Sequence, residues 1–224
     1  MKKILRDDFI QKSGAILGEI LKTIEKQPVL DIKEIEPEKT VLVIVDMING
    51  FAREGALKSP RVEEMIPEIC RISKLCDKYK IKKIAFADNH TDKSPEFDAY
   101  PAHCLVGTAE SEVVDEIKDI GGYMLIKKNS TNGFLEEEFQ KWLKENPELD
   151  TFIVVGDCTD ICVQQFAVTL KTYYNMKDKK SRIIVPLDAV DTFDLGQHYG
   201  DLMNVMAVFN MMGNGIEVVR GIKE

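Results

Sequence analysis

Six short apolar runs, rich in β-branched residues, recur along the chain with helical stretches between them. In order, the runs are "TVLVIVD", "IKKIAFAD", "YMLIKK", "DTFIVVGD", "SRIIVPLDAV" and "GIEVV". The first shows no alternation of apolar and polar residues, which is typical of strands buried on both faces of a sheet. Helical periodicity marks the segments Arg61–Lys80, Glu110–Ile120, Leu135–Asn146, Cys162–Asn175 and His198–Met212. This alternation predicts an α/β fold of three layers, with a mostly parallel central sheet of about six strands and helices on both faces.

The N-terminal segment has a different character. Apolar residues in the segment 4–26 fall at helical spacing with charges between them, which predicts an amphipathic helix. A charged connector containing Pro37 follows. We therefore divide the chain into an N-terminal helix with its connector, residues 1–38, and a main domain, residues 39–224. The helix either packs on its own domain or reaches a partner subunit, and we expect a homo-oligomer.

Composition narrows the class of partner. The formal net charge is −8, and an acidic surface repels phosphate backbones, so we expect no nucleic-acid partner. No apolar run reaches membrane-spanning length, so we expect no membrane partner. Asp7 and Asp8 interrupt the N-terminus before the apolar core of a signal peptide develops. The five cysteines, an odd number, do not suggest a secreted disulfide framework, and we expect reduced thiols in a cytoplasmic protein.

Polar side chains collect where the predicted strands end. In chain order they are Asp46, Asp88, His90, Lys127, Lys128 and the segment 157–162. Open parallel sheets bind their ligands beyond the carboxyl ends of the strands. We therefore expect these groups to line one crevice, with the strands that end at Asp46 and Lys128 adjacent to each other. Alternation along the third strand turns Lys127 away from the side that Lys128 faces.

Two cysteines lie four residues apart in "GDCTDICV". The run "TDIC" predicts a helix start with Thr159 or Asp160 as N-cap. Cys162 then lies in the first helical turn, where the positive end of the helix dipole lowers the pKa of a thiol. We expect Cys162 to be the reactive thiol and Cys158 to contribute its backbone. A small buried core residue at position 162 and a structural zinc clip are the alternatives, although no second cysteine pair completes such a clip.

The segment Asn89–Thr108 is the longest stretch without periodicity, and it holds two of the three histidines. Together with the end of the preceding strand it supplies Asp88, His90, Glu96 and His103. One carboxylate with two imidazoles suits zinc, iron or manganese and leaves open positions for a ligand. These side chains are therefore either surface polar groups or the ligands of one divalent transition metal.

These motifs resemble those of the isochorismatase-like cysteine hydrolases, and within them the nicotinamidases, over roughly residues 40–220. "VDMINGF" is similar to the motif with the catalytic aspartate, "ADNH…YPAHC" to the nicotinamidase metal motif, "KKNSTNGF" to the lysine motif and "GDCTDICV" to the nucleophile motif. The resemblance implies a Rossmann-like fold and a cis peptide bond before Cys158. It selects Lys128 over Lys127 as the catalytic lysine. This sequence departs from the usual pattern at Asn89 and Tyr100, where the family commonly has tryptophan.

The resemblance also implies an activity and a set of roles. Nicotinamide would be hydrolysed to nicotinic acid and ammonia in NAD salvage, through a thioester on Cys162. Asp46 would carry the proton, Lys128 would stabilise the thiolate, and the backbone amides of Cys158 and Cys162 would form the oxyanion hole. A divalent metal held by Asp88, His90 and His103, with Glu96 as a possible fourth ligand, would position the substrate ring. Phe51 and Tyr100 would form walls of the substrate pocket.

Two other classes of function remain open from the sequence. One is a different hydrolase of the same superfamily, acting on another small amide, a ureido compound or a vinyl ether. The other is a thiol-redox or metal-binding protein without hydrolase activity, which would use Cys158 and Cys162.

Overall fold

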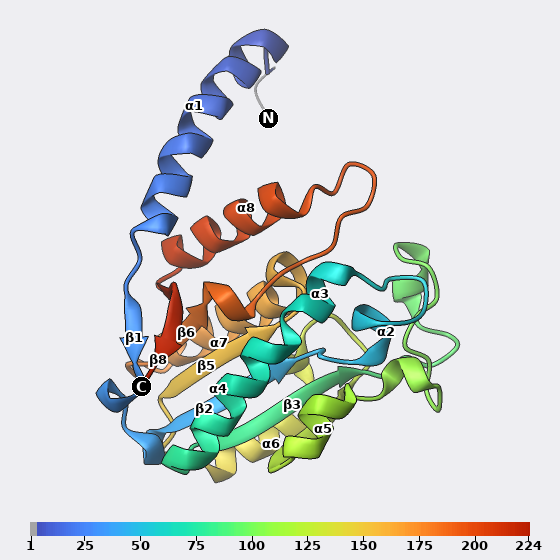
Figure 1. Ribbon diagram of the computed structural model, residues 1–224, viewed down its shortest axis with the longest axis vertical. Coiled ribbons are helices and arrows are strands. Elements are labelled where there is room, and N and C mark those ends of the chain that lie inside the picture. The colour runs from blue at the N-terminus through green and yellow to red at the C-terminus, as the bar shows by residue number, and fades with distance from the viewer. Residues whose placement is uncertain (1–3) are drawn as a thin grey trace.

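A computed structural model describes residues 4–224 and shows a six-stranded sheet at the centre of the molecule (Figure 1). The strand order is β4-β3-β2-β5-β6-β7, and every pairing is parallel. These strands are β2 (Thr40–Val45), β3 (Lys82–Asp88), β4 (Tyr123–Lys128), β5 (Thr151–Gly156), β6 (Arg182–Pro186) and β7 (Glu217–Val219). The predicted fold class and the predicted number of strands are confirmed.

Helices cover both faces of this sheet. One face carries α4 (Ile66–Tyr79) and α5 (Asp115–Ile120), and the other carries α6 (Glu137–Glu145), α7 (Gln164–Met176) and α8 (Gly200–Gly213). Strand β2 shows why its sequence has no polar alternation. Leu42 and Ile44 enter the core under α4, whereas Val41 and Val43 enter the core under α7. Both faces of β2 are therefore apolar because both are buried.

The predicted helix boundaries need three corrections. The segment 61–80 is two helices, α3 (Pro60–Glu64) and α4, because Pro67 lacks an N–H and lies in the first turn of the second. The segment 110–120 is a short 3-10 turn, Ala109–Ser111, followed by α5. The helix expected to begin at "TDIC" begins with a π-type turn, Thr159–Val163, and its N-cap is Cys158 rather than Thr159 or Asp160.

The N-terminal segment forms the helix α1 (Arg6–Glu25), as predicted, and then a strand that the sequence did not suggest. That strand, β1 (Val29–Asp31), pairs in parallel with β8 (Gly221–Lys223) at the other end of the chain. Helix α1 contacts α8 and extends beyond the rest of the molecule (Figure 1). Among residues 4–224, no helix combines the length and the apolar character that a bilayer span requires.

Candidate active site

The nucleophile motif lies where β5 ends against β2. Gly156 has φ +110°, and a Cβ there would lie 2.0 Å from the carbonyl oxygen of Val45, so only glycine lets the two strands end this close together. The peptide bond between Asp157 and Cys158 is cis, as the motif implied. The carbonyl of Cys158 accepts hydrogen bonds from the amides of Ile161 and Val163, both at 3.1 Å, which closes the π-type turn around Cys162.

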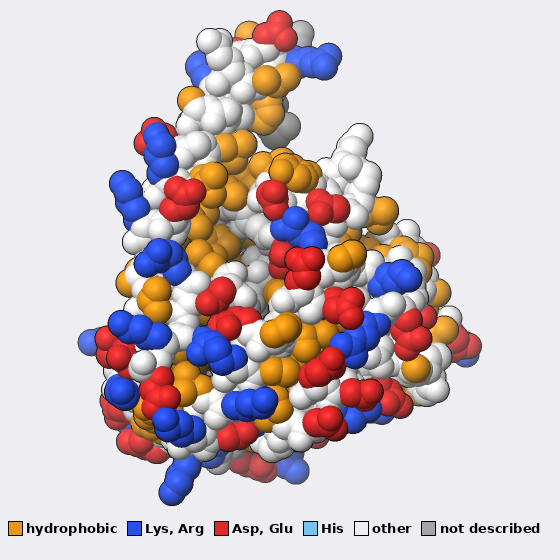
Figure 2. Space-filling view, in the orientation of Figure 1, with side chains coloured by type: hydrophobic (Ala, Val, Ile, Leu, Met, Phe, Trp, Pro, Cys, Tyr) orange, Lys and Arg blue, Asp and Glu red, His pale blue; other side chains and the backbone are white. Residues whose placement is uncertain are grey.

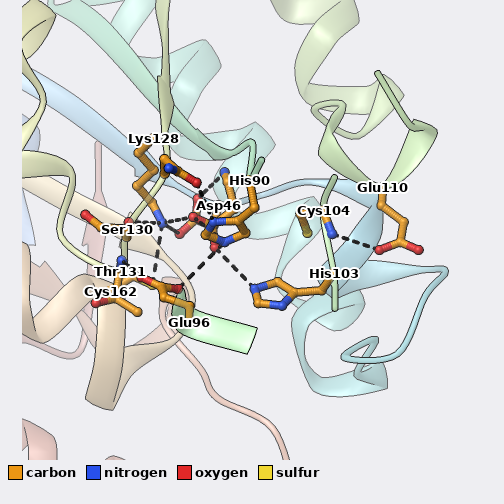
Figure 3. A network of polar contacts seen from close by, with 12 residues as sticks. Asp46, His90, Glu96, His103, Cys104, Glu110, Lys128, Ser130, Thr131 and Cys162 are labelled. Atoms are coloured by element: carbon orange, nitrogen blue, oxygen red, sulfur yellow. Dashed lines mark hydrogen bonds and ion pairs between the residues drawn. The ribbon is translucent and has the colours of Figure 1, made fainter. Parts of the chain in front are cut away.

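Lys128 lies at the centre of a buried cluster of charges (Figure 3). Its ammonium nitrogen is 2.8 Å from Asp46 Oδ2, 2.5 Å from Asp88 Oδ1 and 3.7 Å from the sulfur of Cys162. The neighbouring Lys127 is exposed, as the alternation predicted. The strands β2 and β4 are not adjacent, which corrects the expected order, because β3 lies between them. The length of the Lys128 side chain spans this intervening strand.

Asp46 is held in one orientation. Its backbone is left-handed, with φ 52°, a conformation that costs of order 1 kcal/mol and that recurs at functional sites. Oδ1 accepts a hydrogen bond of 3.0 Å from the amide of Asp88. Oδ2, which faces Lys128, is therefore the atom that can exchange a proton. One carboxylate oxygen each of Asp46 and Asp88 and the sulfur of Cys162 lie within 4.8 Å of one another.

Burial dominates the protonation of this cluster. Burial and the Asp88 carboxylate raise the pKa of Asp46 to about 6, against the opposing effect of Lys128. Burial lowers the pKa of Lys128, but Asp46 and Asp88 more than reverse this and raise it well above its ordinary value. Burial also raises the pKa of the Cys162 thiol, although Lys128 opposes this. The expectation of a depressed thiol pKa was therefore wrong, because burial and the nearby carboxylates of Asp46 and Asp88 outweigh the effect of Lys128.

A second group of polar atoms meets beside Asp88. Ligand atoms of Asp88, His90 and His103 lie within 4.8 Å of one another. His90 Nε2 is 3.5 Å from Asp88 Oδ1 and 3.7 Å from Glu96 Oε2, and His103 Nε2 is 3.9 Å from Asp88 Oδ2. The distances of 3.7 Å and 3.9 Å are too long for hydrogen bonds. His90 Nε2 is buried without a hydrogen-bond partner in the described part of the chain.

The surroundings of the two imidazoles suit a metal. His90 Nδ1 is 3.2 Å from Asn129 Oδ1, and His103 Nδ1 is 2.8 Å from the carbonyl oxygen of Pro101. Because both oxygens are acceptors, each Nδ1 donates its proton and each Nε2 keeps a lone pair directed at the group. Burial lowers the pKa of His103, which favours the neutral form that binds metals, whereas at His90 the Asp88 carboxylate outweighs burial and raises the pKa. The donor set fits a divalent transition metal.

Glu96 was the least certain of the expected ligands, and the structure brings it to the same place. Its Oε1 accepts a hydrogen bond of 2.8 Å from the amide of Thr131, so Oε2 is turned toward His90 (Figure 3). Glu110, whose carboxylate accepts from the amide of Cys104 at 2.9 Å, lies away from this group and supports the loop instead.

The two polar groups open into one small pocket with mainly apolar walls. Phe51 and Tyr100 line it, where the resemblance placed them. Sequence reasoning missed several other lining residues. They are Leu57, Thr131, Ile161 and Phe193. Asp88, Glu96, His103, Cys158 and Cys162 form its polar part.

Phe193 is held in place by His198, the histidine outside the metal motif. The two rings are stacked, with centroids 4.0 Å apart and an angle of 7° between their planes. His198 Nε2 lies 2.9 Å from Asp160 Oδ2, which ties this loop to the turn that carries Cys162. The sequence signal that could have found this contact is weak, because Asp160 and His198 are 38 residues apart.

Comparisons with known proteins place the chain in a family. The Isochorismatase domain model matches residues 40–215. Nicotinamidase 1 of Arabidopsis thaliana is 31% identical over 211 residues, covering 81% of this chain and 85% of that protein. N-carbamoylsarcosine amidase of Thermoplasma acidophilum superposes with a TM-score of 0.67 at 27% identity, covering 81% and 96% of the two chains.

A more distant structure has the same fold. The pyrazinamidase of Pyrococcus horikoshii in complex with zinc has a TM-score of 0.68 at 21% identity and covers 81% of this chain and 99% of its own. The matched span of the family model contains the complete Cys162 cluster and the Asp88 group described above. The chain belongs to the isochorismatase family.

Proposed function

We propose that this protein is a nicotinamidase, which hydrolyses nicotinamide to nicotinic acid and ammonia through a cysteine thioester and serves NAD salvage. The observation that carries the proposal is the position of Cys162, 3.7 Å from a buried lysine and in the same apolar pocket as the Asp88, His90 and His103 donors. The nicotinamidase of Arabidopsis thaliana, similar over most of both chains, supports the same substrate.

The first half of the reaction needs a thiolate. The sulfur of Cys162 attacks the carboxamide carbon while its proton passes to Asp46 Oδ2. At ordinary pKa values this transfer costs about 6 kcal/mol. The raised pKa of Asp46, about 6, makes it a stronger base and lowers this cost, whereas burial of the Cys162 thiol adds to it. Lys128 opposes the effect of burial by stabilising the negative charge on sulfur. Asp46 then gives the proton to the departing ammonia, and the thioester remains on Cys162.

The second half reverses these roles. Asp46 takes a proton from a water molecule as that water attacks the thioester, and Cys162 leaves and is reprotonated. Both halves pass through a tetrahedral oxyanion. We assign its stabilisation to the backbone amides of Cys158 and Cys162, which belong to the N-cap and the π-type turn around the nucleophile.

Asp88, His90, His103 and Glu96 would hold the metal, a single divalent zinc, iron or manganese ion. When bound, it supplies a Lewis-acidic anchor for the ring nitrogen of the substrate. The protein itself provides the flat walls, with Phe51 and Tyr100 beside the ring, and these orient the amide toward Cys162. We further propose that the substrate is a small molecule and that the enzyme is a cytoplasmic homo-oligomer without a nucleic-acid partner.

Ammonia release from a panel of small amides tests the proposal. We expect nicotinamide and pyrazinamide to be the best substrates and a metal chelator to reduce turnover, with recovery on adding zinc or manganese. The similarity to N-carbamoylsarcosine amidase favours a ureido compound as the second candidate substrate. Faster hydrolysis of an N-carbamoyl amino acid than of nicotinamide would overturn the nicotinamidase proposal while leaving the cysteine hydrolase chemistry in place.

A further inference from the structure

Helix α1 exposes an unusually apolar face for a surface helix. Eight large apolar side chains in this region are 43% to 65% exposed to solvent. Ile4 and Leu5 precede α1, four lie on α1 and two lie on α8; the six on the helices are Phe9, Ile10, Ile16, Leu21, Met206 and Phe209. Figure 2 shows hydrophobic side chains along α1 and on the adjoining surface of α8. Monomeric proteins rarely leave patches of this size uncovered, and such patches mark interaction sites.

Only the C-terminal half of α1 is covered by its own chain. Ile24 is buried and Ile20 half-buried against the core that contains Val208 of α8. A helix of 20 residues is about 30 Å long, and the N-terminal half of α1 lies well beyond α8. Residues 4–12 are therefore exposed throughout. An isolated helical end of this kind is only marginally stable in water. The apolar face of α1 thus has two parts. Its C-terminal part contacts α8, and its N-terminal part is exposed to solvent.

We propose that this surface, defined as the apolar face of α1 with Met206 and Phe209 of α8, binds the same surface of a second copy of the chain. On α8, Met206 and Phe209 are exposed next to the contact with α1, and an apolar helix would cover them. The projecting half of α1 is such a helix. A two-fold axis lets each copy supply the helix that the other lacks, which is the isologous arrangement of most dimers.

The available area supports a dimer. At about 200 Å² for a fully exposed large apolar residue, the eight half-exposed side chains offer on the order of 800 Å² per copy. A standard stable interface buries about 800 Å² per partner. The patch is therefore large enough for specific self-association without any other contact.

The charges of α1 favour a second copy over a membrane surface. Between Arg6 and Glu25 the helix carries three basic and four acidic residues, and the whole chain has a net charge of −8. Helices that lie in a membrane interface have a polar face rich in lysine and arginine, which anionic lipids attract. Two copies of α1, each close to neutral, approach one another with little repulsion.

Sedimentation velocity of the 224-residue chain at micromolar concentration tests this proposal. We expect a species of twice the mass of one chain. The double variant Phe9→Glu/Ile16→Glu should weaken association roughly a thousandfold, because four apolar side chains per dimer lose their burial. The matched control, Gln11→Glu/Ala15→Glu, adds the same charge to exposed positions on the opposite face of α1 and should remain dimeric.

Far-UV circular dichroism of both variants checks that α1 remains folded, and each variant should hydrolyse its amide substrate at the wild-type rate. A wild-type protein that sediments as a monomer at tens of micromolar would overturn the proposal. So would a double variant that remains dimeric, or a monomeric wild type that co-sediments with vesicles of phosphatidylglycerol and phosphatidylcholine.

Discussion

Replacing Asp46 by asparagine removes the proposed general base but keeps the shape of the side chain. Asparagine has the same shape, and its Oδ1 can still accept the hydrogen bond from the amide of Asp88. The variant cannot take a proton from Cys162. Since a positioned general base contributes a factor of 10² to 10⁴, we expect kcat to fall by about that amount while the fold is retained. In the wild type, activity should fall below pH 6, because the base must be ionised and its pKa is about 6.

Asp46→Asn should also change how the free energy of unfolding depends on pH, and the raised pKa of Asp46 gives the sign of this change. Burial raises the pKa of Asp46 from 3.8 to about 6, so the folded protein holds this proton more tightly than the unfolded chain. The contribution of Asp46 to the free energy of unfolding is therefore full below about pH 4 and is lost as the pH rises through 6. The loss is about 3 kcal/mol. Asparagine does not titrate, so the variant should gain about 3 kcal/mol relative to the wild type between pH 4 and pH 7.

Urea unfolding at a series of pH values, monitored by circular dichroism, measures this difference. Asp188→Asn is the matched control, because partial burial and Glu68 also raise the pKa of Asp188 to about 6 but the side chain is not among those that line the Cys162 pocket. It should change the pH dependence of stability less, because Asp188 is only partly buried and keeps contact with solvent, whereas Asp46 is fully buried, and it should leave kcat unchanged. Parallel stability curves for Asp46→Asn and the wild type, or an Asp46→Asn enzyme of normal rate, would refute the assignment of Asp46 as a buried base.

Six further substitutions address the nucleophile, the metal and the pocket wall. Cys162→Ala should abolish turnover, whereas Cys158→Ala should keep much of it, and equal losses in an ammonia-release assay would instead favour a dithiol mechanism. His103→Ala should lose bound metal in elemental analysis and raise KM more than it lowers kcat, because the proposed metal positions the ring; metal retained at the wild-type level would contradict this. Phe193→Ala should raise KM about tenfold by removing an aromatic wall, and His198→Ala should raise it less, with partial recovery in His198→Phe, which restores only the stacked ring.

The parts of this molecule that follow from the sequence are those set by local pattern. Buried β-branched runs predicted the strands, and the residues at their ends predicted which side chains meet, because the carboxyl ends of parallel strands share an edge. Alternation showed that Lys127 and Lys128 face opposite sides of the sheet, and the resemblance selected Lys128 as the lysine of the site. The order of the strands could not be read in this way. Nothing local shows that β3 lies between the strands of Asp46 and Lys128.

Properties that depend on burial were the least predictable. The position of Cys162 at a helix start suggested a lowered pKa, but its surroundings come from several segments distant in sequence, and these exclude water. Phe193 and His198 were missed for a related reason. His198 was expected to begin a helix, whereas in the structure it precedes α8, and the contact between Asp160 and His198 that fixes its position spans 38 residues.

The cluster around Lys128 contains two carboxylates, one ammonium group and one thiol, all within a few ångströms and out of contact with solvent. When the proton moves from Cys162 to Asp46, charge is redistributed inside this cluster, but its total charge is conserved. The proposed substrate is neutral as well, so neither its approach nor the attack on it separates charge over a Debye length. The rate should therefore be almost independent of ionic strength, in spite of the net charge of −8, and the enzyme would work equally well in dilute and in concentrated salt.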